Sequence, residues 1–361
     1  MTSPIRADIQ ALKAYPVPSS AGLIKLDAME NPYLLPEAVR QALAERLSRQ
    51  ALNRYPDAHH QELKSCLREA MGLHAGAGLL LGNGSDELIQ MIAMAVSCPG
   101  AVVMSVDPSF VMFRMIATFL GMRYVGVPLR EDFSLDGPAL LASIEIHRPA
   151  VIFLAYPNNP TGNLFDPAVV REVLRVAPGL VVVDEAYFPF TDHSFLGELD
   201  RYPRLLVMRT LSKLGLAGVR LGFLAGDPEL VGHLDKVRLP YNLSVLDQVA
   251  VVEVMTRHRG VLQSQVACLR EDRQRLFDAM QCMAGVEVFP SEANFLLFRV
   301  VAAGRVFDGL LQHGILVKNM SAAHSLLDNC LRVTVGTPEE NRRFLEVLGQ
   351  VLPRAAGTSA P

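Results

Sequence analysis

The chain has 361 residues, of which 50% are hydrophobic and 20% charged, enough for two domains with a large buried core. This composition excludes a disordered or low-complexity protein. The formal net charge of −3 gives no basic excess, so we expect no nucleic-acid partner. We also expect no membrane association, because no apolar run reaches the about 18–20 residues that span a bilayer. Five cysteines without a C-x-x-C pair, and no apolar signal segment in the first 30 residues, favour a cytoplasmic location.

Short apolar runs alternate with helix-length patterns between about residues 80 and 225. The runs that predict strands lie at 101–106, 151–156, 180–183 and 204–210. A helix-length stretch at 109–121 follows the first of them. Nearly continuous apolar strands separated by helices indicate a parallel or mixed sheet covered on both faces. Because ligands bind at the carboxyl ends of such strands, the residues after each run are the candidates for chemistry.

Beyond about residue 245 the pattern changes to one long helix, roughly 246–283, followed by short strands around two more helices. This arrangement is typical of a second, α+β domain. The predicted division is an N-terminal arm at 1–30, a large domain at 31–245, a small domain at 246–354 and a disordered tail at 355–361. The segment 31–50 is a candidate to pack with the small domain.

The basic residues are strongly biased, since 28 of the 34 are arginine and six are lysine. Lys213, in RTLSKLGLAGVR directly after the run at 204–210, is the only lysine between Lys64 and Lys236. An amine among small and apolar neighbours has a lowered pKa and can act as a nucleophile that forms a Schiff base. A lysine that extends its ammonium group to solvent is the alternative on this feature alone.

Asp184 ends the run LVVVD and is followed by Glu-Ala-Tyr. A carboxylate at the end of a parallel strand can hold a cationic heterocycle or a metal, or can simply form a turn or cap a helix. Nucleotide hydrolases share the apolar run followed by Asp-Glu, but the chain has no G-x-x-x-x-G-K-[ST] segment, which excludes that class. It also has no H-E-x-x-H segment and no histidine–cysteine set at ligand spacing, so we predict no metal site.

Two further segments fit ligand binding and also fit ordinary structure. The glycine-led helix start at 82–87 offers free backbone N–H groups to a phosphate, although Ser, Asp and Glu are also the usual residues of a helix start. The turn at 157–162 follows a predicted strand, where Asn159 can donate a hydrogen bond to a bound hydroxyl. Tyr187 can do the same beyond Asp184.

In their order along the chain, an N-P-T-G turn, four apolar residues followed by DEAY, and S-K followed by G-L-A-G-x-R resemble the fold-type I, class II aminotransferases. These enzymes use pyridoxal 5′-phosphate (PLP). Nine ordered motifs narrow the resemblance to the histidinol-phosphate aminotransferase family, over roughly residues 10–350. They are KLDAMENPY (25–33), NRYPD (53–57), LGNGSDELI (81–89), PNNPTG (157–162), DEAYFPF (184–190), RTLSKLGLAGVRLG (209–222), VRLPYNLS (237–244), SEANFLLFR (291–299) and CLRVTVGTPEEN (330–341).

The resemblance implies an α/β protein of PLP fold-type I. Its large domain would hold a mixed, mostly parallel seven-stranded sheet covered by helices, beside a smaller α+β C-terminal domain. It also implies a homodimer that transfers the amino group between L-glutamate and imidazole-acetol phosphate, giving L-histidinol phosphate and 2-oxoglutarate in histidine biosynthesis. Alternatives on the same scaffold are a threonine-phosphate decarboxylase and an aromatic amino acid aminotransferase. A PLP-binding transcription regulator is the alternative from another class, disfavoured by the pI near 6.3 and the short segment before the match.

The same resemblance assigns roles position by position. Lys213 would form the Schiff base with PLP and transfer the proton, and Asp184 would keep the pyridine nitrogen protonated. Asn159 and Tyr187 would donate to the phenolic oxygen of PLP. Phe110 would stack on the ring, at a position where the family most often has tyrosine. The implied phosphate ligands are Ser85, Asp86, Thr210, Ser212, Arg220 and, from the neighbouring subunit, Tyr55.

On the substrate side, Arg332 matches the arginine that binds the anionic group of the substrate, and a bidentate guanidinium suits a carboxylate or a phosphate. Tyr15 matches a substrate-contacting tyrosine of the N-terminal arm. Lys318 stands where the family has its second anion-binding arginine, and a lysine supplies a point charge without the fork. Arg220 follows Lys213 by seven residues instead of the usual eight, which indicates a small local adjustment.

Overall fold

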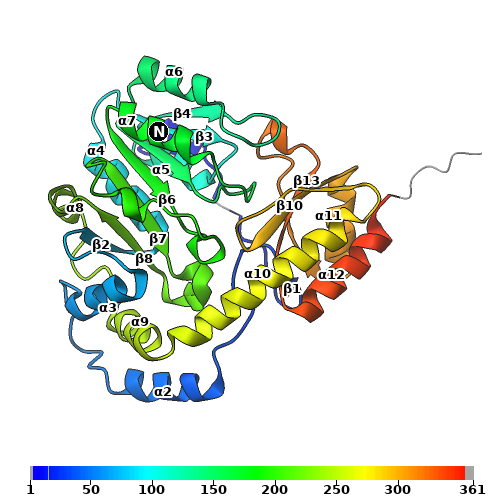
Figure 1. Cartoon of the computed structure of the whole chain (residues 1–361), viewed down its shortest axis with the longest axis horizontal. Coiled ribbons are helices and arrows are strands. Elements are labelled where there is room, and N and C mark those ends of the chain that lie inside the picture. The colour runs from blue at the N-terminus through cyan, green and yellow to red at the C-terminus, as the bar shows by residue number, and fades with distance from the viewer. Residues whose placement is uncertain (1–2, 15, 354–361) are drawn as a thin grey trace, which may run out of the picture.

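The computed structural model describes residues 3–14 and 16–353. A seven-stranded sheet with the strand order β2-β8-β7-β6-β5-β3-β4 forms the centre of the larger unit (Figure 1). Its strands are β2 (Gly78–Asn83), β3 (Val102–Asp107), β4 (Arg123–Pro128), β5 (Val151–Ala155), β6 (Leu180–Asp184), β7 (Leu205–Thr210) and β8 (Leu221–Gly226). All neighbouring pairs are parallel except those of β8, which is antiparallel to both β2 and β7. The predicted mixed, mostly parallel sheet is therefore confirmed.

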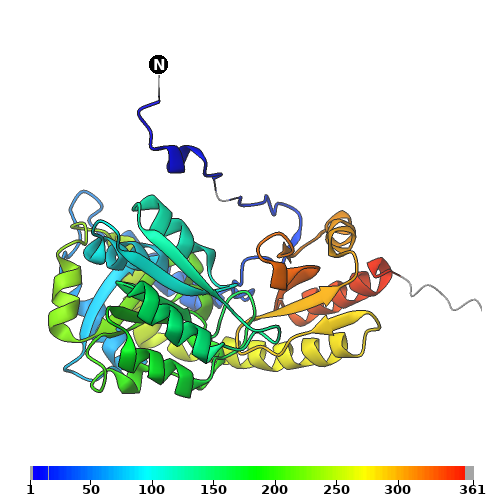
Figure 2. The same cartoon turned by 90° about the horizontal axis from the view of Figure 1, so that it is seen from above.

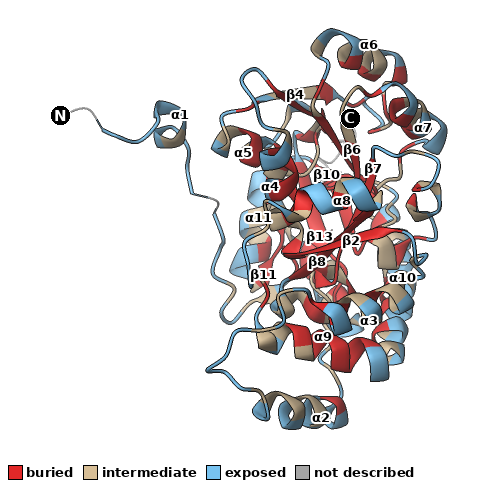
Figure 3. Cartoon of the chain, turned by 90° about the vertical axis from the view of Figure 1, so that its left-hand side faces the viewer, coloured by how far each residue is buried: buried red, intermediate tan, exposed pale blue. Residues whose placement is uncertain are grey.

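Helices cover both faces of this sheet, which explains why its inner strands are mostly apolar. In β5, Ile152 and Leu154 pack with one cluster and Val151 and Phe153 with the other. Helices α4 (Gly84–Val96), α5 (Val111–Phe119) and α8 (Pro228–Asp235) cover one face, and α6 (Gly137–His147) and α7 (Pro167–Val176) cover the other. Because the residues of the inner strands β5, β7 and β8 are all buried on one face or the other, no polar alternation remains in them, whereas Arg123 and Pro128 of the edge strand β4 are exposed. Figure 3 shows the buried strands between partly exposed helices.

The smaller unit is built on an antiparallel sheet with the order β12-β13-β10-β9. These strands are β9 (Val286–Val288), β10 (Phe295–Val300), β12 (Lys318–Asn319) and β13 (Cys330–Thr334). Helices α11 (Ala303–Gln312) and α12 (Pro338–Val351) pack against it together with α10 (Arg259–Gln281), which reaches it from the larger unit (Figures 1 and 2). The expected smaller α+β unit is therefore present.

The sequence predicted one helix over 246–283, and this prediction is wrong in one detail. The structure has α9 (Val245–Arg257) and α10, separated at His258, whose φ of −127° and ψ of 13° leave the helical region. Helix α9 packs against α3 (Gln61–Met71) and α2 (Glu37–Ser48). The proposed boundary at residue 245 stays a prediction, as does the tail at 355–361, which lies outside the described residues.

The N-terminal segment contacts both units. Its strand β1 (Ile24–Lys25) pairs in parallel with β11 (Ile315–Leu316) of the smaller unit. Further towards the N-terminus, beside the short helix α1 (Ala7–Gln10), the guanidinium of Arg6 donates to the carbonyl oxygens of Thr118 and Phe119 at 2.8 and 3.0 Å. These contacts satisfy carbonyls at the carboxyl end of α5. Among the helices of residues 3–14 and 16–353, none has both the length and the apolarity that a membrane crossing requires.

Candidate active site

A cavity of about 380 Å³ lies at the carboxyl ends of the parallel strands, where β8 begins. Ten of the residues singled out in the sequence line it. They are Ser85, Asp86, Phe110, Asn159, Asp184, Tyr187, Thr210, Ser212, Lys213 and Arg220. They come from six separate segments of the chain, each of which follows or precedes a strand of the central sheet. The topology therefore brings together residues that are up to 135 positions apart.

Lys213 projects into this cavity from the turn after β7. The turn spans Ser212–Leu216, and Gly215 takes a φ of 132° that side-chain-bearing residues rarely adopt. A Cβ atom at Gly215 would also lie 2.9 Å from the Nδ2 atom of Asn31. The Lys213 ammonium donates to the carbonyl of Ala28 at 3.2 Å. Burial, and next the charge of Arg332, lower the pKa of Lys213 to about 8. A usable fraction of neutral amine is therefore present near neutral pH.

Asp184 lies at the end of β6 and is 3% exposed. Its Oδ1 accepts a hydrogen bond from the N–H of Ala186 at 3.1 Å. Burial raises the pKa of Asp184 to about 7, and the nearby carboxylates of Asp86 and Glu185 add to the effect. A cationic group placed against a carboxyl group whose pKa is raised in this way stabilises its ionised form.

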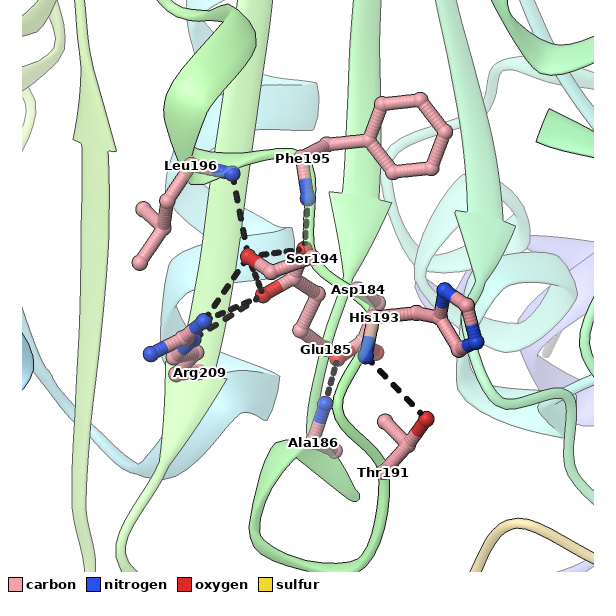
Figure 4. Close-up of polar contacts among 9 residues, drawn as sticks. All are labelled: Asp184, Glu185, Ala186, Thr191, His193, Ser194, Phe195, Leu196 and Arg209. Carbon is pink, nitrogen blue, oxygen red and sulfur yellow. Dashed lines mark hydrogen bonds and ion pairs between the residues drawn. The ribbon is translucent and has the colours of Figure 1, made fainter. Parts of the chain in front are cut away.

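Behind Asp184 lies a buried ion pair whose role the sequence reasoning missed (Figure 4). Glu185 is fully buried and accepts from Nε and Nη2 of Arg209 at 2.9 and 2.8 Å. It also accepts from the N–H of Phe195 at 2.6 Å and from the hydroxyl of Ser194 at 2.9 Å. These bonds fix the loop that follows Tyr187 against the ends of β6 and β7. Glu185 and Arg209 both belong to motifs quoted above, and this membership was the sequence feature that could have identified the pair.

A chain of hydrogen bonds joins Tyr187 to the smaller unit. Nδ2 of Asn159 donates to the Tyr187 hydroxyl at 3.1 Å, and Oδ1 of Asn159 accepts from Nη1 of Arg332 at 2.5 Å. The other terminal nitrogen of Arg332, Nη2, donates to the carbonyl of Asp27 at 3.0 Å. Arg332 lies on β13 and is 6% exposed. The predicted substrate arginine is therefore linked directly to a residue of the first cavity.

The far side of the first cavity is a set of hydrogen-bond donors. The first turn of α4 presents the backbone of Ser85 and Asp86, and no side chain caps this helix. The hydroxyls of Thr210 and Ser212 lie 2.9 Å apart, and Nη1 of Arg220 donates to Ser212 at 3.5 Å. A Cβ atom at Gly222 would lie 2.7 Å from the backbone of Gly84, so glycine permits the close approach of β8 to α4. This set suits an anion.

A second cavity, of about 160 Å³, adjoins the first. The two share Met29, Phe110 and Asn159, and the second is also lined by Arg332 and Lys318. Lys318 lies on β12 of the smaller unit and pairs in register with Arg332. Both predicted substrate-binding cations are therefore in the second cavity.

One further predicted residue, Tyr55, lies elsewhere. Tyr55 lines neither cavity of its own chain; it is 80% exposed and stacks on Tyr241, with ring centres 4.4 Å apart. Its predicted contact with a second subunit stays a prediction. Tyr15 lies outside the described residues.

Comparison with known proteins gives the family to which the chain belongs. The family model for aminotransferase class I and II matches residues 21–348, and the chain belongs to this family. It is 54% identical to Histidinol-phosphate aminotransferase 2 of Cupriavidus pinatubonensis, an alignment that covers 96% of each chain. Histidinol-phosphate aminotransferase 1 of Ralstonia nicotianae is also 54% identical, over 96% of this chain and 94% of the relative.

Solved structures show the same fold. The histidinol-phosphate aminotransferase from Sinorhizobium meliloti, solved in complex with pyridoxal-5′-phosphate, superposes with a TM-score of 0.86 at 24% identity, covering 97% of this chain and 98% of that one. An L-threonine-O-3-phosphate decarboxylase from Porphyromonas gingivalis superposes with a TM-score of 0.76 at 19% identity, covering 91% and 99%. The fold is thus shared by enzymes of both kinds and does not choose between them.

Proposed function

We propose that this chain is a PLP-dependent histidinol-phosphate aminotransferase. It transfers the amino group between L-glutamate and imidazole-acetol phosphate, giving L-histidinol phosphate and 2-oxoglutarate in histidine biosynthesis. The observation that carries the proposal is the 54% identity to relatives of that name along almost the whole of each chain. The cavity that gathers Lys213 opposite a buried Asp184 supplies the chemical support.

The residues of the first cavity fit PLP. The donors at the start of α4, the hydroxyls of Thr210 and Ser212 and the guanidinium of Arg220 suit its phosphate. Asp184, with its pKa raised by burial, suits a protonated ring nitrogen. The volume of about 380 Å³ is in the range of small-molecule sites. When bound, PLP supplies an electron-withdrawing ring that stabilises negative charge at the substrate Cα.

The protein's own groups bind, orient and move protons. The neutral amine of Lys213 is the nucleophile, and it is also the base that takes the proton from the substrate Cα and, as the acid, donates it in the 1,3-proton shift. The Asp184 carboxylate would stabilise the positive charge of a protonated ring nitrogen. Asn159 orients the Tyr187 hydroxyl, and Phe110 forms an apolar wall. Arg332 and Lys318 hold the anionic end of the substrate in the second cavity.

A homodimer in the cytoplasm is part of the proposal. The exposed side chains of Leu52, Tyr55, Leu239 and Tyr241 support a dimer, because two of them stack and none of them is covered by the chain's own core. The five cysteines form no disulfide and support a reducing compartment. Sedimentation at increasing protein concentration tests the dimer, and a monomer at micromolar concentration would contradict it.

The function is tested by mixing PLP-loaded protein with L-histidinol phosphate and following visible absorbance in a single turnover. Conversion of the pyridoxal form of the cofactor to its pyridoxamine form is expected. Release of CO₂ from threonine phosphate without this conversion would favour the decarboxylase and defeat the proposal. Faster conversion with phenylalanine than with histidinol phosphate would favour the aromatic aminotransferase.

A further inference from the structure

The second cavity contains a residue cluster that the proposed roles leave unused. Besides Lys318 and Arg332, its walls include Asp107 at the end of β3, Arg114 in α5 and Tyr124 in β4. Since the cavity shares Met29, Phe110 and Asn159 with the first, a molecule that extends from one reaches the other.

The charge of the second cavity is positive. Its described lining residues include the cations Arg114, Lys318 and Arg332 and one carboxylate, that of Asp107. That carboxylate is already engaged, by Nη2 of Arg114 at 2.5 Å and by the hydroxyl of Tyr124 at 3.1 Å. An excess of two positive charges suits an anion with two negative charges better than one with a single charge.

Arg114 is held in a defined orientation while much of it stays accessible. Its guanidinium carbon lies 4.2 Å from the centre of the Tyr124 ring, and Asp107 binds one of its terminal nitrogens. The side chain is 55% exposed, and Nη1 and Nε have no partner among the described residues. Two N–H-bearing nitrogens of a planar fork are therefore available to a ligand.

The neighbouring backbone is shaped to hold this cluster. A Cβ atom at position 126 would lie 1.7 Å from Oδ2 of Asp107, so Gly126 on β4 leaves the room that the carboxylate occupies. Ser109, Phe110 and Val111 also line the cavity, at the start of the nine-residue helix α5, which has no side-chain cap. The uncapped N–H groups there add partial positive charge near Arg114.

We infer that Arg114 binds the phosphate of the phosphorylated substrate and is a specificity-determining residue for it. The inference rests on the proposed function. Lys318 contributes a point charge from the smaller unit, and Arg114 contributes the planar fork from the larger unit. Asp107 and Tyr124 are positioning residues, because they orient Arg114 without facing the substrate as free charges. Arg114 of α5 thereby makes the protein prefer a substrate with a phosphate over one with a neutral hydroxyl.

The first test measures phosphate binding apart from turnover. PLP-loaded wild-type protein and its Arg114→Met, Arg114→Lys and Arg123→Met variants are titrated with inorganic phosphate, read by calorimetry. Arg123 is the matched control, because it is exposed, lies at the end of β4 that is paired with Val102 and not with Asp107, and contacts His147. Arg114→Met should weaken phosphate binding about tenfold or more, Arg114→Lys less, and Arg123→Met less than twofold.

The second test compares histidinol phosphate with histidinol as amino donors. Arg114→Met should raise KM for histidinol phosphate about tenfold with little change in kcat, and leave kcat/KM for histidinol within twofold. Equal losses on both donors, or unchanged phosphate affinity, would overturn the inference. If wild-type protein does not use histidinol phosphate at all, the proposed function fails, and the phosphate titration still decides whether Arg114 binds the anion.

Discussion

The two cavities are built from different parts of the fold. The first is formed mainly by the carboxyl edge of one sheet, with short turns, small residues and buried partners such as Glu185 and Arg209. The second lies between two units and is lined by long charged side chains, one on α5 and two on the antiparallel sheet. A rigid edge suits chemistry, where small displacements are costly, while separate long side chains suit recognition. Changes in the first cavity should therefore affect rate and stability, and changes in the second substrate affinity.

The largest effect should come from Lys213→Ala. The variant loses the amine that acts as nucleophile and base, so single-turnover amino transfer should fall by at least about 10⁴-fold. Stopped-flow absorbance with L-histidinol phosphate measures this. Because the other residues of the cavity remain, equilibrium dialysis should still detect bound PLP. Lys236→Ala, which removes an exposed lysine outside both cavities, is the control and should keep the wild-type rate.

The next largest effect should be on stability, from Glu185→Gln. The change leaves Arg209, which is 7% exposed, without its charged partner, and should lower the free energy of unfolding by about 3–5 kcal/mol. Urea unfolding measures it. The double variant Glu185→Met with Arg209→Met should recover most of the loss, because no buried charge is left unpaired. A single substitution that costs under about 1 kcal/mol would show that the pair does not hold the loop behind Asp184.

The difference between the cavities also explains what the sequence could predict. Lys213 and Asp184 each lie at or just after the end of a predicted strand, so the local pattern singled them out as candidates, and the family resemblance supplied their roles. Glu185 pairs with Arg209 because β6 and β7 lie side by side in the sheet, and the residues around each of them in the sequence do not indicate this pairing. From the sequence alone, Arg114 is an ordinary exposed helix residue. Its role becomes visible only in the structure, where β4 places Tyr124 beside Asp107. The break at His258 is marked in the sequence only by the weak helix formers Thr256 and Gly260 beside it, and single residues of this kind also occur inside helices.

A smaller effect should appear in how the stability of the cofactor-free protein depends on pH, and Asp184 should cause it. Burial raises the pKa of Asp184 to about 7 from an ordinary value near 3.8. Between these values the folded state binds more protons than the unfolded state, so stability falls as pH rises from about 4 to 7. Asp184→Asn removes this loss, and at pH 8 should be more stable than wild type by a few kcal/mol, since each pKa unit corresponds to about 1.4 kcal/mol. Thermal unfolding at pH 4 should show no such gain. A gain of equal size at pH 4 and pH 8 would contradict the raised pKa of Asp184 as its cause.

The smallest effect should come from Arg332→Lys, and it tests whether the cavities are as separate as their construction suggests. Arg332 is buried, and its fork holds both Asn159 of the first cavity and the Asp27 carbonyl. A lysine keeps the charge and loses the fork, so KM should rise about tenfold, near 1.4 kcal/mol, for glutamate and histidinol phosphate alike. Arg114, half-exposed and held only by residues of the second cavity, should discriminate between these substrates. Steady-state kinetics of both variants on both substrates gives the comparison. If Arg332→Lys affected the phosphorylated substrate alone, the link through Asn159 would have no part in binding, and the two arginines would form one phosphate site.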